Sequence, residues 1–210
     1  MENLLDNYSK DNYSTYNNYN NEYNVSQAMQ DTFMAYVDGV IPRTPGLAEE
    51  YGRIQYFGAL DSYTDEYVIY TLNYNDIPLA NEVAQLLDLA GEQLLMAETY
   101  NNQVNYPLYP AESTFVSLSD VNRFRALSYL EQNSEYVGGL PEILTENPGL
   151  VRTINSTLSR YTMLGYYSEW SGYGNTRLNP PLERILEFYP LSWSQIEYPG
   201  PSLGYRALRE

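Results

Sequence analysis

The chain has 210 residues, of which 43% are hydrophobic, and its 27 acidic and 11 basic side chains give a formal net charge of −16 at pH 7. It contains neither cysteine nor histidine, which excludes disulfides, thiolate catalysis, the usual structural zinc sites and histidine general bases. The negative charge disfavours nucleic acid as a partner, because phosphate backbones bind basic surfaces. Length and composition fit one domain with a hydrophobic core.

The first 25 residues form a low-complexity arm rich in Asn, Tyr, Asp and Ser. We predict that this arm is disordered, because its polar side chains compete for backbone hydrogen bonds and it has little aliphatic content to bury. One helical domain is predicted from residue 26 to residue 210. No run approaches the roughly 20 apolar residues that span a bilayer, and no export signal is recognisable, so the sequence favours a cytoplasmic location.

The first helix is predicted from Ser26, which is placed to cap it. Its apolar residues recur at helical spacing on one face: Met29, Phe33, Tyr36, Val37 and Val40. The prolines at 42 and 45 then end the helix, because residues before proline avoid helical backbone angles. A second apolar stripe from residue 47 to residue 60 has helical spacing but is interrupted by Gly52 and Gly58, for which close packing is one explanation.

Three more helices are predicted downstream, with one ambiguous run before them. Residues 67–74, YVIYTLNY, suit a strand by propensity, although a buried piece of helix is also compatible with their length. Residues 79–99 have the strongest helical pattern. A further helix begins near Ser119, is marked by the apolar residues Val121, Phe124, Leu127 and Leu130, and is closed by Gly138-Gly139. The last begins at Pro148, with an inward face of Leu150, Ile154, Leu158, Tyr161 and Met163 or Leu164.

The segment from residue 165 to residue 209 is irregular and contains both tryptophans, repeated glycines and paired prolines. Glycine and proline fix unusual backbone angles, while aromatic rings supply large contact areas. The segment is therefore interpreted either as a docking surface for a partner or as an ordered loop that caps the protein's own core.

Familiar catalytic signatures are missing from the sequence. Gly172-Tyr173-Gly174 lacks the third glycine of a dinucleotide fingerprint and follows a helix instead of a strand. A carboxylate pair, Glu169 with Glu183 or Glu187, is the acid–base option that is left, and it makes a hydrolase the third-ranked hypothesis. The sequence predicts that this chain is not an enzyme.

Several short motifs, in this order, resemble the gluconate 2-dehydrogenase subunit 3 family over most of residues 27 to 209. They are Ile41-Pro42-Arg43-Thr44-Pro45-Gly46 after an amphipathic helix, Leu118-Ser119, residues 162–168, Gly172-Tyr173-Gly174, and Trp193 followed by Tyr198-Pro199-Gly200-Pro201. The resemblance implies a small, mainly α-helical subunit that holds no cofactor. It would support the maturation or stability of a large flavin-dependent sugar or alcohol dehydrogenase with FAD in that partner, and a cytochrome can complete such complexes. The Asn/Tyr-rich arm stands where the family often has an export signal.

Under this hypothesis the irregular segment lies against the catalytic subunit. The anchors would be Trp170, Tyr173, Trp193 and Tyr198, with Arg177 beside them and Gly174, Pro199, Gly200 and Pro201 shaping the surface. Two alternatives stay open. Both tryptophans could instead be internal core residues, and the whole chain could be a tyrosine-rich structural or spore-coat-like protein that self-assembles through its arm in a spore or cell-surface layer.

Overall fold

The structure, a computed structural model, describes residues 25–74, 76–97, 113–133, 138–195 and 197–199. These ranges are mainly helical and contain no strand, which confirms the predicted mainly α fold. The predicted disorder of the N-terminal arm concerns residues outside the described ranges, except for Val25. In chain order the longer helices are α3 (Gln27–Val40), α5 (Thr64–Asn73), α6 (Ala80–Met96), α8 (Asp120–Asn133) and α10 (Pro148–Tyr167).

Short helices connect and extend these five. Between α3 and α5 the chain forms η1 (Pro45–Leu47), α4 (Ala48–Tyr51), η2 (Arg53–Tyr56) and η3 (Ala59–Ser62). Before α8 and α10 lie α7 (Thr114–Ser117) and α9 (Glu142–Glu146), and after α10 come η4 (Trp170–Thr176), η5 (Pro181–Glu183) and α11 (Leu191–Gln195). Within the described ranges, no helix combines the length and the apolar character that a membrane span requires.

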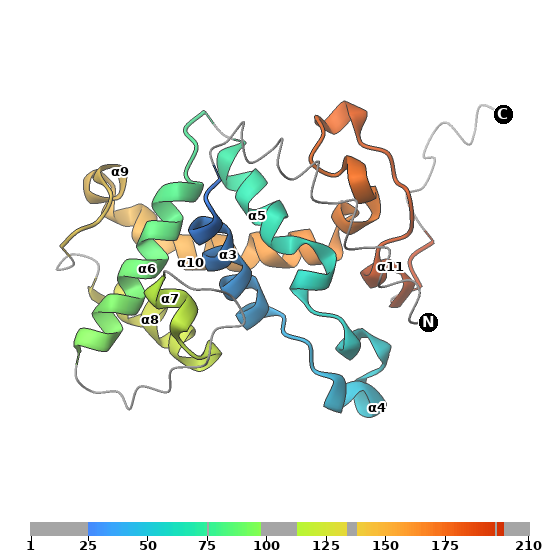
Figure 1. Cartoon of the computed structure of the whole chain (residues 1–210), viewed down its shortest axis with the longest axis horizontal. Coiled ribbons are helices and arrows are strands. Elements are labelled where there is room, and N and C mark those ends of the chain that lie inside the picture. The colour runs from blue at the N-terminus through green and yellow to red at the C-terminus, as the bar shows by residue number, and fades with distance from the viewer. Residues whose placement is uncertain (1–24, 75, 98–112, 134–137, 196, 200–210) are drawn as a thin grey trace.

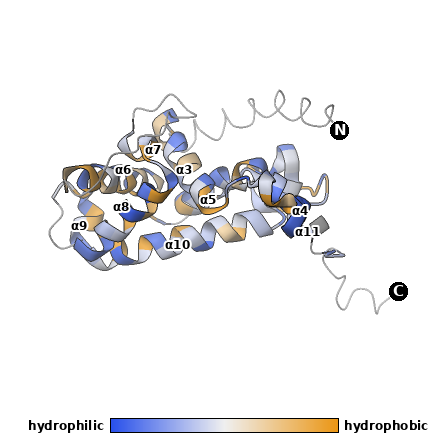
Figure 2. Ribbon diagram, turned by 90° about the horizontal axis from the view of Figure 1, so that it is seen from below, coloured by the Kyte–Doolittle hydropathy of each residue, from blue (hydrophilic) through white to orange (hydrophobic). Residues whose placement is uncertain are grey.

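The five longer helices form one body with a continuous aliphatic core. α3 lies centrally, with α5 and α6 against it, while α10 runs along one side of the body for much of its length (Figures 1 and 2). One cluster joins α3, α5 and α6 through residues such as Phe33, Ile69 and Leu87. A second joins α6 and α8 to α9 and the start of α10 through Leu86, Leu130 and Val151 among others, all buried.

Two helices begin where the sequence predicted, at residues with a known preference for helix starts. The Ser26 hydroxyl accepts a hydrogen bond from the Met29 amide at 3.2 Å, as expected for the residue that caps a helix. Pro148 occupies the first turn of α10, where its missing N–H costs nothing. Residues 67–73 are helical within α5, so the helical alternative for this run was right and the strand propensity was overridden by burial of Val68, Ile69 and Leu72.

The stripe from residue 47 to residue 60 does not form one helix. Gly52 has φ +90°, which is outside the helical region, and separates α4 from η2. Gly58 lies against the chain after α3, where a Cβ would stand 2.8 Å from the Ile41 carbonyl oxygen and 2.9 Å from the Arg43 nitrogen. The close packing proposed for the glycines therefore holds for Gly58, whereas Gly52 serves a turn.

Only two of the four apolar residues that predicted α8, Leu127 and Leu130, are buried in it. Val121 and Phe124 are exposed, whereas Arg123 is buried. Its guanidinium donates to the carbonyls of Ala35, Phe115 and Val116 at 3.1, 3.3 and 2.8 Å. The arginine takes an interior place because it satisfies carbonyl groups at the ends and turns of neighbouring elements.

The inward face predicted for α10 is right for Leu158, which is buried, and for Ile154 and Tyr161, which pack against the core. It is wrong for the other positions. Leu150, Met163 and Leu164 are exposed, and the buried positions are Val151, Leu158, Thr162, Gly165 and Tyr166. Gly165 is required by close packing, since a Cβ there would stand 2.7 Å from Cδ1 of Tyr67. Gly165 also lies within α10, so the irregular segment begins at Ser168, three residues later than predicted.

Candidate functional site

The chain that follows α10 forms a separate lobe at one end of the helical body (Figure 1). We call residues 168–199 the C-terminal segment. It contains η4, η5 and α11 joined by irregular backbone, so it is less extended and more ordered than a simple tail. Both tryptophans of the chain, Trp170 and Trp193, lie in it.

Trp170 fixes the start of the segment to α5. Its side chain is 2% exposed, and its Nε1 donates a hydrogen bond to the Tyr63 carbonyl oxygen at 2.9 Å. The indole also meets the ring of Tyr67 edge-on, with 5.3 Å between centroids, and the ring of Tyr70 at 5.7 Å. A buried indole contributes a large apolar contact area, and the hydrogen bond from its N–H fixes the orientation of the ring.

Arg177 makes the second attachment to the same region of α5. Its Nε and Nη2 donate to the two carboxylate oxygens of Glu66 at 2.6 and 2.9 Å, and its Nη1 donates to the Gly174 carbonyl at 2.7 Å. The guanidinium carbon lies 4.0 Å from the centroid of the Tyr63 ring. Arg177 and Glu66 are both buried, so this forked pair is shielded from solvent.

Tyr63 contacts both Trp170 and Arg177, and its backbone conformation is unusual for a residue other than glycine. Its φ of 53° and ψ of 38° place it in the left-handed region immediately before α5. For a residue other than glycine this conformation costs on the order of 1–3 kcal/mol and persists where the surroundings enforce it. The bond from Trp170 to its carbonyl and the guanidinium of Arg177 on its ring provide that enforcement.

The segment folds back on itself at Gly172. The Gly172 carbonyl accepts hydrogen bonds from the amides of Glu187 and Phe188 at 2.8 and 3.2 Å. A Cβ at this position would stand 2.5 Å from the Phe188 carbonyl oxygen, and Gly174 has φ +50° beside the Glu187 carboxylate. The two glycines of the Gly-Tyr-Gly motif therefore permit the close approach of residues 187 and 188.

Trp193 closes the segment onto the end of α10. It is 7% exposed, and its Nε1 donates to the Tyr167 carbonyl at 3.3 Å. The ring of Tyr198 meets it edge-on at 4.8 Å, and Tyr189 lies 6.2 Å away. Tyr189 and Tyr198 are themselves exposed, so the buried ring of Trp193 packs beneath two tyrosine rings at the surface.

The predicted docking residues divide into interior and surface positions. Trp170, Gly174, Arg177 and Trp193 are interior, which favours the alternative that both tryptophans are internal and corrects the idea that these side chains are surface anchors. Tyr173 is half-buried and donates to Glu169 at 3.1 Å. Tyr198 and Pro199 are exposed, and Gly200 and Pro201 lie outside the described residues. For the exposed residues, docking stays a prediction.

The sequence analysis missed a run of exposed apolar side chains between the prolines of the segment. Leu182 is fully exposed, Ile185 is 65% exposed and Tyr189 is 62% exposed, with Leu186 and Phe188 also classed as exposed. We call residues 182–189 the apolar ridge. The signal in the sequence is the run LERILEFY, which is bounded by Pro180-Pro181 and Pro190 and has five large apolar residues in eight positions.

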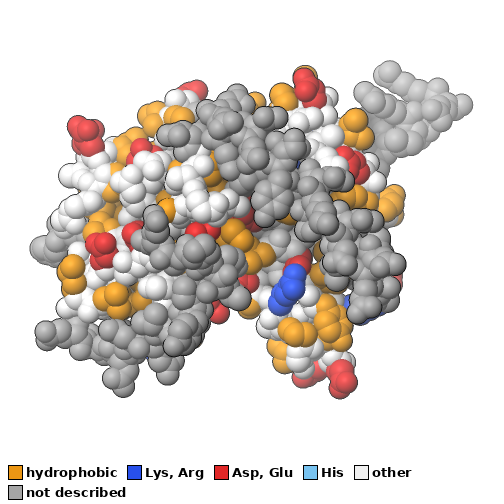
Figure 3. Space-filling view, viewed as in Figure 1, with side chains coloured by type: hydrophobic (Ala, Val, Ile, Leu, Met, Phe, Trp, Pro, Cys, Tyr) orange, Lys and Arg blue, Asp and Glu red, His pale blue; other side chains and the backbone are white. Residues whose placement is uncertain are grey.

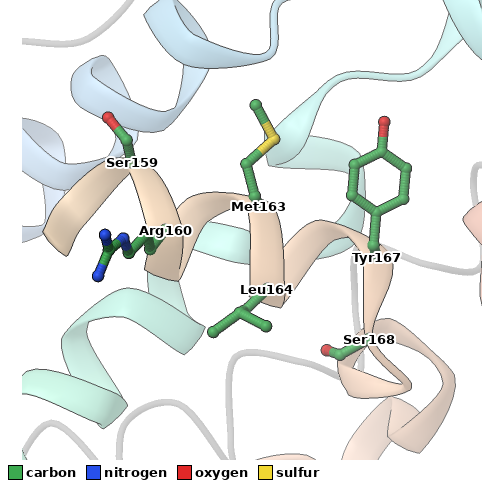
Figure 4. A pocket seen from close by; sticks show the side chains of 6 residues that line it. All are labelled: Ser159, Arg160, Met163, Leu164, Tyr167 and Ser168. Carbon is green, nitrogen blue, oxygen red and sulfur yellow. The ribbon is translucent and has the colours of Figure 1, made fainter. Parts of the chain in front are cut away.

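The outer face of α10 extends this apolar character. Met163 and Tyr167 project to one side of the helix in line with Ser159, while Leu164 and Arg160 lie on the neighbouring row (Figure 4). With Ser168 they line a groove of about 690 Å³. Tyr167 connects this face to the segment, because its carbonyl accepts the hydrogen bond from Trp193.

Charge around the site is mixed, whereas the molecule is strongly acidic. On the face shown in Figure 3, the acidic groups are spread over several places and basic groups are few among the described residues. The α10 helix, by contrast, contains Arg152 and Arg160 and no Asp or Glu. In the described ranges, no three His, Cys, Asp or Glu side chains converge in a way that could hold a metal ion.

Comparison with known proteins gives no relative from which a function could be carried over. No protein-family model, no curated protein and no solved structure matches this chain.

Proposed function

We propose that this chain is a non-catalytic small subunit that binds a larger protein through its C-terminal segment. The observation that carries the proposal is the apolar ridge: five large apolar side chains exposed within eight residues on a segment that is anchored at both ends. Contiguous exposed apolar surface on a soluble protein is typical of interaction sites. Anchoring the ridge beforehand reduces the conformational entropy that docking would cost.

The identity of the partner comes from the sequence resemblance. A large flavin-dependent sugar or alcohol dehydrogenase, with FAD bound in that subunit and a cytochrome as a further component, is the partner that the gluconate 2-dehydrogenase subunit 3 pattern implies. The role that we assign to this chain is to support the maturation or stability of that partner, because the apolar ridge is suited to binding another protein. The cytoplasmic location stays a prediction of the sequence.

Co-expression with a large flavin-dependent sugar or alcohol dehydrogenase from the same genome tests the proposal. We expect a one-to-one complex by size-exclusion chromatography with light scattering, with flavin absorbance in the same peak. Interface anchors typically contribute 2 kcal/mol or more, so Ile185→Glu in the apolar ridge is expected to weaken binding by about 30-fold or more. Ile77→Glu is a matched control, because Ile77 has a similar exposed fraction, 57%, and lies outside the segment.

Two outcomes would reject the proposal. The first is a flavoprotein that matures fully and elutes alone in the presence of this chain. The second is binding that Ile185→Glu and Ile77→Glu weaken equally, which would place the contact elsewhere.

The structural-protein alternative has one observation in its favour, which is the exposure of tyrosines at several separate places. Tyr51, Tyr56, Tyr74, Tyr167 and Tyr189 all have more than half of their surface accessible. Light scattering of the purified chain alone separates the two candidates. Large assemblies that grow with concentration and need no flavoprotein would favour the structural protein.

A further inference from the structure

The groove on the outer face of α10 is open in the folded chain (Figure 4). Met163, Leu164 and Tyr167, which line it, are 45%, 55% and 53% exposed. The apolar ridge is exposed as well, so the ridge of a chain does not fill the groove of the same chain. Two apolar surfaces that both face solvent are typical of sites that another protein covers.

The groove and the apolar ridge lie at the same end of the molecule. The groove ends at Ser168, where the C-terminal segment begins. The ridge is bonded to Gly172, whose carbonyl accepts hydrogen bonds from the amides of residues 187 and 188 at 2.8 and 3.2 Å. The four residues from Ser168 to Gly172 span at most about 14 Å. The end of the ridge is therefore held near the end of the groove.

The charges beside the two surfaces are opposite in sign. The exposed side chain of Arg160 lines the groove, and the exposed carboxyl of Glu183 lies beside Leu182 in the ridge. Neither of these two makes an ion pair with any residue that the structure describes. Among the five longer helices, α10 alone has arginines and no Asp or Glu. Its outer face is therefore where a chain of net charge −16 repels an acidic neighbour least.

We propose that a second copy of this chain occupies the groove, with the apolar ridge of each copy in the groove of the other. Ile185 packs against Leu164 and its neighbours, and Glu183 pairs with Arg160 at the rim. Because ridge and groove lie at the same end, two copies related by a two-fold axis make both contacts at once, and the dimer is closed. This goes beyond the proposed function, since a flavoprotein has to displace the second copy to reach the ridge.

A second copy is favoured over other occupants because the complementary surface is on the chain itself. The groove fits an apolar segment with a carboxylate beside it, and the ridge has five large apolar residues in eight positions with Glu183 among them. Pairing in which the same two patches serve both copies needs no further component, and two-fold dimers are the commonest soluble oligomers.

Sedimentation velocity of the full chain alone, over a range of concentrations, tests the dimer. The wild type should shift from the chain mass of 24.2 kDa to twice that mass and stop there. Ile185→Glu in the ridge and Leu164→Glu in the groove should each weaken the dimer about 30-fold at each of its two contacts. Both positions are more than half exposed, so the fold should be retained. The matched control is Ile77→Glu, outside both surfaces, which should dimerise like the wild type.

Mixing the two variants separates ridge-in-groove pairing from pairing between like surfaces. Homodimers of either variant lack both contacts, whereas the mixed pair has one intact contact: the ridge of the Leu164→Glu chain in the groove of the Ile185→Glu chain. We expect the mixture to dimerise more strongly than either variant alone. A mixture that fails to do so, or a dimer that only one of the two variants weakens, would overturn the proposal.

An exchange of charges tests the pairing of Arg160 with Glu183. Arg160→Glu places like charges together and should weaken the dimer about tenfold, and addition of Glu183→Arg should restore it. Arg152→Glu makes the same change of net charge on α10 outside the groove and should have little effect. If the second substitution restored nothing, this pairing would be wrong.

Two further results would overturn the closed dimer: a wild type that stays monomeric at every concentration, and assemblies that continue to grow beyond two copies. No flavoprotein is present in these measurements. The dimer can therefore fail while the one-to-one complex with a flavoprotein forms, and the complex can fail while the dimer forms.

Discussion

The helical body and the C-terminal segment are held together by different kinds of contact. The body buries aliphatic side chains such as Leu86, Leu87 and Leu158 in clusters that join several helices. The segment is attached through aromatic and guanidinium groups, and three of these attachments include a directed hydrogen bond: Trp170 to Tyr63, Arg177 to Glu66, and Trp193 to Tyr167.

This difference determines how each region responds to damage. The burial free energy of the body is spread over many aliphatic side chains. Truncating one of them therefore removes only part of the stabilisation of its cluster. A directed attachment depends on the placement of a few atoms, and loss of one partner leaves the other buried and unsatisfied. We therefore expect the segment to detach locally while the body stays folded.

The largest expected effect is that of Arg177→Ala. Removing one partner of a buried ion pair costs about 3–5 kcal/mol, because the remaining charge is left unpaired. We expect the segment to lift from α5, with a red-shifted tryptophan emission and nearly unchanged helical circular dichroism. Both tryptophans lie in the segment, so the emission reports this region alone.

A core variant is the control for that result. Leu87→Ala removes a fully buried side chain shared by α3, α5 and α6, at a cost of about 2–5 kcal/mol. It should lower the midpoint of denaturant unfolding for circular dichroism. If Arg177→Ala instead shifted the fluorescence and dichroism transitions together, the segment and the body would be one cooperative unit and the comparison would fail.

A smaller effect is expected for Gly172→Ala. The added methyl would stand 2.5 Å from the Phe188 carbonyl and 2.7 Å from Cδ1 of Leu186, and overpacking of this kind costs about 1–3 kcal/mol. The outcome to measure is faster hydrogen exchange in residues 184–190. Gly149→Ala is the matched control, since nothing lies within 4 Å of its added carbon, and it should be neutral or stabilising by up to about 1 kcal/mol.

Features that depend on neighbouring residues were predictable from the sequence. The cap at Ser26 and the start of α10 at Pro148 follow from chemistry within one turn. The rotation of α8 was not predictable, because Arg123 is buried by carbonyls that lie as far away as Ala35, 88 residues earlier in the chain. Apolar periodicity could not show that an arginine would occupy the inward face.

The candidate site shows the same division. The composition of the C-terminal segment indicated that it is ordered by contacts elsewhere, and the structure supplies those contacts. For two of these contacts, however, the partner lies more than 100 residues away: Glu66 precedes Arg177 by 111 positions and Tyr63 precedes Trp170 by 107. Sequence reasoning therefore left open whether the tryptophans are surface anchors or internal residues, whereas the structure buries both of them and leaves Ile185 and its neighbours exposed.

The smallest effect concerns the body, at Tyr36→Phe. The Tyr36 hydroxyl lies 3.1 Å from Ser159 Oγ and 3.3 Å from the carbonyl and side-chain oxygens of Asn155, and losing these contacts should cost about 1 kcal/mol at neutral pH. Burial, with Glu131 adding to it and Ser159 opposing it, raises the pKa of Tyr36 to about 12. Unfolded tyrosine ionises near pH 10, so the folded state holds more protons between pH 10 and 12 and stability falls as pH rises through that range. Between pH 9 and pH 11, the free energy of urea unfolding should fall less in Tyr36→Phe than in the wild type. An equal fall would mean that the Tyr36 hydroxyl is hydrated and that the middle of α10 packs more loosely than the contacts indicate.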